Sequence, residues 1–209
     1  MAGEQVTRVE LTATGVTGDR IVQVYDATGR VATARRHPRL LQLHATLGPG
    51  GDPLVDGMPW DAPEITSRVQ DIVGRGASLE RFEGIERFDV LPLLVGTDGA
   101  AAAFGRDVRR LRPNLLIAGV EGLAEREWPG GTLRLPHGEI RVAGLRMRCV
   151  MTTYDPDTIQ QDRGVLRDIV RRFDGRLFLD AAVARAGFVA EGDPVELILP
   201  DDAPGHRSR

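Results

Sequence analysis

The sequence predicts an α+β fold: a β-barrel-like core with a few peripheral helices and an N-terminal β-rich subdomain. Three observations lead to this prediction. Short apolar runs, several of them alternating with polar residues, recur between turn-forming residues along the chain. Only three longer segments show helical spacing, and no internal repeat is visible. The chain has 209 residues with 42% hydrophobic content, which is enough for one large core or two small ones.

The first part of the chain reads as strands, then a loop, then a helix. Strands are predicted at 6–11, 21–25 and 30–34. The segment Asp26-Ala-Thr-Gly29 is a hairpin signal between the second and third of these strands. Residues 48–61 are rich in Gly, Pro and Asp and predict a loop. A helix is expected to begin at Pro63 and to end at Gly74.

The second part alternates strands with two helices. Strands are predicted at 89–95, 114–118, 132–143 (a hairpin turning at His137-Gly138), 176–183, 187–190 and 195–199. Helices are expected at 98–111, where Pro113 ends the pattern, and at 163–173. We therefore expect an N-terminal β-rich subdomain over 1–85, a core domain over 86–200 and a flexible tail over 201–209.

Composition excludes several classes of function. There is no lysine, so all 27 basic residues are arginine, which excludes a P-loop lysine and a pyridoxal-phosphate Schiff base. A net charge of -3 argues against nucleic acid as a partner. No apolar run approaches membrane-spanning length and no signal peptide is visible, so we expect a cytoplasmic protein without membrane contact. The single cysteine excludes an internal disulfide.

That cysteine lies in the segment with the strongest chemical signal. Cys149 directly follows Arg148, and Arg146 is close by. Positive potential favours the thiolate, which is the form that attacks electrophiles and binds soft metals. The alternative is a buried, inert cysteine at the end of a strand.

Two further groups of arginines can bind an anion. Arg112 and Asn114 stand where a predicted helix passes into a strand, and guanidinium groups fork onto phosphate or carboxylate oxygens. The alternative there is a basic last helical turn that complements the helix dipole. Arg20 and Arg36 belong to turn and hairpin segments that can hold an anionic tail, or that form a solvated strand edge. The Glu-rich stretch that ends in Trp128 can line a site, although such a tryptophan is more often packed in a core.

In order along the chain, these segments resemble the MOSC family, named after the C-terminal domain of molybdenum cofactor sulfurase. The resemblance is carried by Arg-Pro-Asn at 112–114, the Glu-rich stretch before Trp128, Arg-Cys at 148–149, Asp-Pro-Asp-Thr at 155–158 and Gly-Asp-Pro-Val at 192–195. Gly-Asp-Arg at 18–20 and the Thr-Ala-Arg segment from Thr33 resemble the N-terminal β-barrel region of the mitochondrial amidoxime reducing components and their bacterial relatives.

The resemblance implies a site built on Cys149, which matches the cysteine that ligates molybdenum or carries sulfur in relatives. It also implies that a pterin cofactor and its phosphate are held by the following residues: Arg20, Arg36, Thr97, Asp98, Arg112, Asn114, Arg148 and Asp180. The implied cofactor is the molybdenum cofactor, whose metal suits a soft thiolate ligand.

Two departures accompany the resemblance. Relatives usually begin with a strand carrying Pro-x-Lys-Ser, whereas this chain begins just beyond that point, so we expect a shortened N-terminal barrel region. Asp180 stands where some relatives have tyrosine or asparagine, and a carboxylate near an anionic cofactor is unfavourable unless it is protonated or paired.

Three functions fit the resemblance. The first is a molybdenum-cofactor oxidoreductase that reduces N-hydroxylated or similar small molecules with an external electron-transfer partner, since no flavin, haem or iron–sulfur motif is present. The second is a sulfur carrier that uses a Cys149 persulfide. The third is a non-catalytic ligand-binding module.

Overall fold

The structure is a computed structural model that describes residues 1–200, and its chain forms two compact units. Unit 1 comprises residues 1–6, 18–88 and 154–162, and unit 2 comprises residues 7–17, 89–153 and 163 onward. The chain thus passes between the units several times. The division expected from the sequence, 1–85 and 86–200, stays a prediction, and the expected tail 201–209 lies outside the described residues.

Unit 1 contains short strands and one α-helix, α1 (Pro63–Val73). The strands form an antiparallel pair, β3 (Val22–Tyr25) with β7 (Ser78–Arg81), and a three-stranded sheet of β4 (Ala45–Leu47), β5 (Pro53–Val55) and β6 (Met58–Pro59). The 3-10 helices η1 (Pro38–Gln42) and η2 (Ile85–Arg87) complete it. Ile65 and Val69 bury one face of α1 against the core of this unit, which confirms the helix predicted from Pro63 to Gly74.

Two predictions for unit 1 were wrong. The segment 48–61, expected to be a loop, contains β5 and β6. The segment 30–34 is no strand, because only Val31 forms a bridge, to Tyr25. The Asp26 carboxylate accepts hydrogen bonds from the backbone of Thr28 and Arg30, and this tight turn is followed at once by further turns that lead into η1.

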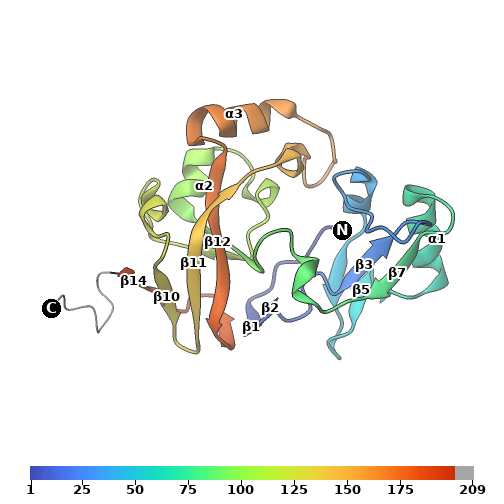
Figure 1. Ribbon diagram of the computed structural model, residues 1–209, viewed down its shortest axis with the longest axis horizontal. Coiled ribbons are helices and arrows are strands. Elements are labelled where there is room, and N and C mark those ends of the chain that lie inside the picture. The colour runs from blue at the N-terminus through green and yellow to red at the C-terminus, as the bar shows by residue number, and fades with distance from the viewer. Residues whose placement is uncertain (201–209) are drawn as a thin grey trace. The chain divides into compact units, whose positions relative to one another are not determined.

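Unit 2 is built on a six-stranded sheet in which the two long strands β11 and β12 run antiparallel (Figure 1). In spatial order the strands are β14 (Glu196–Ile198), β10 (Thr132–Leu135), β11 (Gly138–Met147), β12 (Arg176–Arg185), β8 (Leu93–Thr97) and β9 (Leu115–Ile117). Within this sheet, as far as residues 1–200 describe it, β8 and β9 are the one pair of strands that run parallel. A second sheet joins β13 (Gly187–Ala190), β1 (Arg8–Thr12) and β2 (Gly15–Val16).

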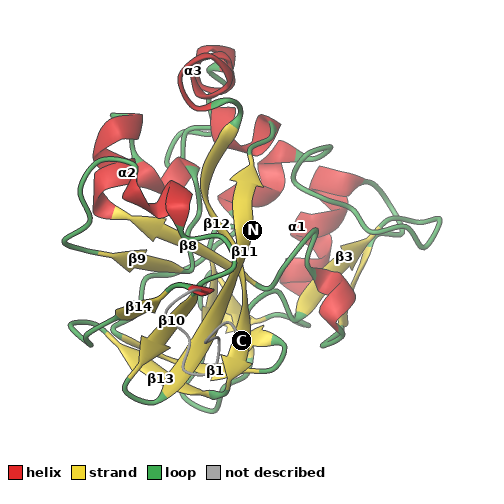
Figure 2. Ribbon diagram, turned by 60° about the vertical axis from the view of Figure 1, so that its left-hand side comes forward, coloured by secondary structure: helices red, strands yellow, loops and turns green. Residues whose placement is uncertain are grey.

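Two α-helices lie at one end of the long strands, and the sheet of β1 and β13 lies at the other end (Figure 2). They are α2 (Asp98–Phe104) and α3 (Arg163–Phe173), and three 3-10 helices join them: η3 (Val108–Arg110), η4 (Ala124–Glu127) and η5 (Val150–Thr153). The bounds of α3 are those predicted. The helix expected over 98–111 ends at Phe104, because Gly105 adopts a left-handed backbone (φ 68°) that closes it.

Two apolar clusters stabilise unit 2. One lies along the strands and includes Leu93, Val95, Leu133, Ile140, Val142 and Leu179. The other joins α2 and α3 to the start of β12 and includes Phe104, Val165, Ile169, Phe173 and Phe178. The predicted fold class is confirmed, since a mixed sheet with few helices accompanies a β-rich N-terminal region. Among residues 1–200, no helix has the length and apolar character needed to cross a bilayer.

Candidate functional site

Cys149 lies two residues after the end of β11 and directly before the short helix η5. Its carbonyl oxygen accepts hydrogen bonds from the Thr152 amide (3.1 Å) and the Thr152 hydroxyl (2.9 Å). The Thr153 hydroxyl donates to the Val150 carbonyl at 2.7 Å. Both threonines are buried, whereas Cys149 is half-buried and its thiol is free. The Thr-Thr pair after the cysteine therefore fixes the turn that presents the thiol.

Arg148 lies beside the thiol with much of its guanidinium enclosed. Its Nη2 donates to the Leu111 carbonyl at 2.6 Å, and its backbone amide donates to the Gly175 carbonyl at 2.8 Å. Its Nε is buried and has no hydrogen-bond partner in the part of the chain that the structure describes. Burial lowers the pKa of Arg148 to about 10, and the charge of Arg146 adds to this effect. The group is thus cationic at neutral pH, with one donor direction unsatisfied.

Arg146 and Asp180 form a buried ion pair across β11 and β12. Nη1 of Arg146 donates to Oδ1 of Asp180 at 2.5 Å, and the two side chains are 19% and 12% exposed. Burial raises the pKa of Asp180, and the Arg146 guanidinium opposes this change. The condition noted for a carboxylate at this position is met, because Asp180 is paired.

The predicted Arg-Pro-Asn turn lies next to these residues through the sheet. The Asn114 side chain accepts a hydrogen bond from the Leu94 backbone amide at Oδ1 (2.9 Å). The backbone amide of Asn114 donates to the Leu94 carbonyl (2.8 Å). Leu94 in turn pairs with Asp180 in the neighbouring strand. Arg112 is exposed and holds a left-handed backbone (φ 57°). The hydrogen bond from Arg110 to the Thr153 carbonyl (3.2 Å) also ties this turn to the cysteine turn.

Cys149, Arg112, Arg146, Arg148 and Asp180 are called the Cys149 cluster below. The charges or dipoles of the other four all act on the Arg148 guanidinium, so the five groups are close enough to interact electrostatically. Four of them were predicted as site residues. The fifth, Arg146, was noted only for its charge, although its position two residues before Arg148, at the end of a strand, could have marked it as a neighbour.

Thr97 and Asp98 lie at the far end of β8 from Leu94. The Thr97 hydroxyl is fully buried, caps α2 by accepting from the Ala100 amide (3.1 Å) and donates to Glu125 (3.3 Å). Asp98 accepts from the amides of Gly119 and Val120 at 2.7 and 2.9 Å, and these backbone bonds lower its pKa. Both residues hold the fold here, and their contact with a cofactor stays a prediction.

Glu125 is a polar group that sequence reasoning did not single out. It is fully buried, its Oε2 accepts a hydrogen bond from the Thr97 hydroxyl, and its Oε1 has no partner among the described residues. Burial raises the pKa of this carboxyl group. Within the Glu-rich stretch 121–127 nothing in the pattern separates it from its exposed neighbours, because the 3-10 helix η4 decides which glutamate turns inward.

Arg20 and Arg36 belong to unit 1. Arg20 has a left-handed backbone (φ 56°), and its guanidinium lies 5.5 Å from the centre of the Phe88 ring. Arg36 is exposed within the turns that precede η1. Their roles as cofactor contacts stay predictions.

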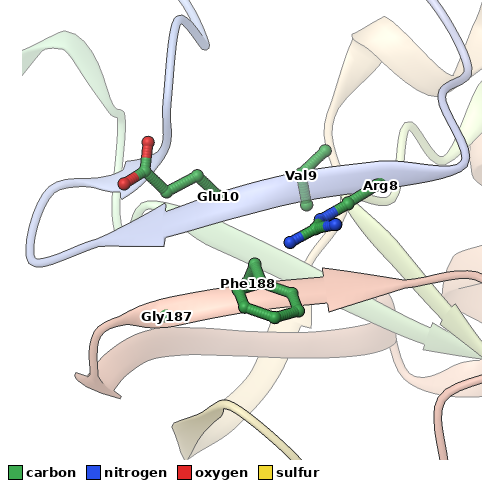
Figure 3. Close-up of a pocket in the computed structure, with 5 residues that line it drawn as sticks. All are labelled: Arg8, Val9, Glu10, Gly187 and Phe188. Atoms are coloured by element: carbon green, nitrogen blue, oxygen red, sulfur yellow. The ribbon is translucent and has the colours of Figure 1, made fainter.

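An open surface pocket lies elsewhere in unit 2, between β1 and β13 (Figure 3). Arg8 stacks on the Phe188 ring with its Cζ 3.9 Å from the ring centre, and the His137 ring stacks on Phe188 at 4.0 Å. Because His137 precedes the first residue of β11 and Cys149 follows its last residues, this pocket lies roughly 30 Å from the thiol. The pocket is therefore separate from the Cys149 cluster.

The cluster offers a metal one ligand of its own. Within the part of the chain that the structure describes, no three His, Cys, Asp or Glu side chains gather to hold an ion. A soft metal on the Cys149 thiolate would need its remaining ligands from a bound molecule. Cationic guanidinium groups beside the thiol, with a buried donor unsatisfied at Arg148, suit a molecule that carries an anionic group.

Comparison with known proteins gives two family matches that cover most of the chain. Residues 98–196 match the MOSC domain, and residues 1–85 match the MOSC N-terminal beta barrel domain. Among solved structures, the YuaD protein from Bacillus subtilis is similar at 15% identity and a TM-score of 0.49, covering 93% of this chain and 86% of that one. A hypothetical protein is similar at 14% identity and a TM-score of 0.38, covering 85% and 67%. No curated protein matches the sequence. The family suggested by the resemblance is thereby confirmed, and the chain belongs to the MOSC proteins, with both the N-terminal barrel domain and the MOSC domain present.

Proposed function

We propose that this protein binds the molybdenum cofactor at the Cys149 cluster and acts as an oxidoreductase on small N-hydroxylated or similar substrates. The observation that carries the proposal is the pairing of a half-buried free thiol with a buried, unsatisfied donor on the adjacent Arg148. A thiolate is a soft metal ligand, and a guanidinium donor suits the anionic group of the same molecule.

Each residue of the cluster has a separate role in this proposal. Cys149 would ligate the metal, and the Thr152 and Thr153 hydrogen bonds hold its turn in place. Arg148 would bind the anionic part of the cofactor through the charge of its guanidinium group, whose Nε has no protein partner among the described residues. Asn114 fixes the neighbouring edge of the site by its two hydrogen bonds to Leu94.

When bound, the molybdenum cofactor supplies a metal that changes oxidation state as an oxygen atom is removed from the substrate. The described residues supply orientation and charge for that chemistry. Electrons come from an external partner, since the sequence has no flavin, haem or iron–sulfur motif. The cytoplasm is the compartment that we propose for this reaction.

The proposal is tested by measuring the molybdenum content per chain by elemental analysis, after purification from a host that makes the cofactor. We expect near-stoichiometric metal in the wild type, at least a tenfold loss in Cys149→Ser and a clear loss in Arg148→Gln. Arg171→Gln is the matched control, because that arginine side chain is 76% exposed on α3. Thermal unfolding checks that each variant is folded.

Two other results would point elsewhere. Cyanide-labile sulfur on Cys149 without metal would indicate the sulfur carrier, which needs only a reactive thiol. Folded wild-type protein with neither metal nor labile sulfur would contradict both catalytic functions and leave the ligand-binding module.

A further inference from the structure

The two guanidinium groups nearest to Cys149 in sequence are held in opposite ways. Arg146 is neutralised by a buried carboxylate, since its Nη1 lies 2.5 Å from Oδ1 of Asp180. Within residues 1–200, the Arg148 side chain donates one hydrogen bond, to the uncharged Leu111 carbonyl, and its buried Nε has no partner. The cluster therefore contains a cation that is already balanced and one that is not.

An anion bound at the cluster is repelled by the Asp180 carboxylate as well as attracted by the arginines. Asp180 acts electrostatically on Arg148, so a ligand that contacts Arg148 is close enough to feel the Asp180 carboxylate too. The carboxylate is mostly enclosed, which limits screening by water and salt. Its repulsion grows in proportion to the charge of the ligand, and so does the attraction that Arg146 would exert if it were released.

We propose that Asp180 is a specificity-determining residue: by neutralising Arg146, it reduces the advantage that the Cys149 cluster gives to doubly charged over singly charged anionic groups. This inference rests on the anion-binding role proposed above. It concerns which charge state of a phosphate-like group is accepted.

The test compares sulfate, a dianion, with nitrate, a monoanion, by isothermal titration calorimetry on metal-free full-length protein at pH 7.5. Asp180→Asn removes one negative charge and releases Arg146. Because Coulomb energy is proportional to ligand charge, a gain of some factor for nitrate corresponds to about the square of that factor for sulfate. We expect sulfate affinity to rise about tenfold or more, and nitrate affinity about threefold.

The ion pair offers its own controls. Arg146→Gln leaves the carboxylate unbalanced and is expected to weaken sulfate more than nitrate, whereas Arg146→Gln combined with Asp180→Asn keeps the net charge and is expected to bind both like the wild type. Asp168→Asn makes the same change at an aspartate paired with Arg106 and Arg171, and should alter neither affinity. If one single variant does not fold, the other two variants of the cycle still decide the result.

Three results would each overturn the inference. Asp180→Asn could change the affinities for the two anions equally, or leave the sulfate affinity unchanged. Alternatively, neither the wild type nor Asp180→Asn could bind sulfate. The molybdenum measurement is independent of this test. Protein without molybdenum that still shows the sulfate and nitrate pattern would contradict the proposed function alone. Molybdenum-loaded protein whose variants do not discriminate would contradict the inference alone.

Discussion

Phe178 and Gly96 show how strongly single residues are constrained next to the cluster. Phe178 is fully buried in β12 two residues before Asp180, and its backbone is left-handed (φ 68°). Such a conformation costs a bulky residue about 1–3 kcal/mol, so its surroundings must enforce it. A Cβ atom at Gly96 in β8 would lie 2.7 Å from the Phe178 ring. Glycine at position 96 is therefore required by the ring across from it.

We predict that Gly96→Ala destabilises the protein by about 1–3 kcal/mol, because the added methyl group overpacks a rigid aromatic contact. Urea denaturation measures the change in the free energy of unfolding. Gly144→Ala is the matched control, since Gly144 is also a strand glycine and a Cβ there meets no atom within 4 Å. Equal losses in the two variants would show that strand propensity, and not the ring, is responsible.

Site residues were predictable from the sequence to the extent that their chemistry is rare. The single cysteine and its neighbouring Arg148 stand out in any reading of the chain. The pairing of Asp180 with Arg146 could not be predicted, because it depends on which residues face each other across β11 and β12. That register is interrupted twice between Val142 and Met147, so counting along the strands does not give it.

At the scale of elements, arginine side chains donate hydrogen bonds to the carbonyl groups at the C-terminal ends of α2 and α3. Arg126 in η4 donates from Nη2 to the Phe173 carbonyl (2.7 Å), at the end of α3, and to the Arg176 carbonyl (3.1 Å), at the start of β12. Arg172 does the same for α2, since it donates to the carbonyls of Ala103 and Phe104. Each of these cations satisfies carbonyl groups at the negative end of a helix dipole.

We predict that Arg126→Gln costs about 1–3 kcal/mol of stability, because it removes charge-assisted hydrogen bonds in a partly buried position. The loss should be concentrated in the last turn of α3, and hydrogen exchange of the amides there should accelerate. Arg171→Gln, an exposed arginine of the same helix, is the control and should change stability by less than about 0.5 kcal/mol. Uniformly faster exchange throughout unit 2 would contradict the local role.

Helices with a complete sequence signature were predicted correctly, whereas one strand with a distant partner was missed. Pro63, Gly74 and the apolar spacing between them define α1 locally. By contrast, β7 was missed because it is stabilised by pairing with β3, more than 50 residues earlier. The helix over 98–111 was drawn too long, since the pattern alone did not show that Gly105 would close it.

At the scale of the whole molecule, each unit has an apolar core of its own. The core of unit 1 is centred on α1, and unit 2 has the two clusters along its sheet and its helices. A composition with 42% hydrophobic residues predicted enough material for such cores. It could not assign them, because residues 7–17 and 154–162 each belong to a unit other than the one that flanks them in sequence.

The buried Glu125 makes stability depend on pH. Its pKa is raised above the ordinary value of 4.5 by burial, which the charge of Arg126 opposes. In the interval between the ordinary and the raised pKa, the folded state binds more protons than the unfolded state, so stability falls as pH rises. Above that interval the folded protein encloses a carboxylate with one unpartnered oxygen.

We predict that Glu125→Gln is more stable than the wild type at pH 8 and that this advantage shrinks as the pH falls toward 4.5. Urea denaturation at pH 8, 6.5 and 5 measures the difference. Glu127→Gln, two residues away and exposed, should follow the wild type at every pH. An advantage of Glu125→Gln that is independent of pH would show that packing, and not the charge, is altered.

The division of the chain has a consequence for modular exchange. The segment that matches the N-terminal barrel domain, 1–85, contains Arg8–Thr12, a strand of unit 2 that pairs there with Gly187–Ala190. The segment that matches the MOSC domain, 98–196, in turn contains residues 154–162, which belong to unit 1. Each segment thus contains residues that belong to the unit formed mainly by the other segment. Gene fusion or recombination that transferred either segment alone would separate β1 from its partner strand β13, so we expect a functional exchange to require both segments together.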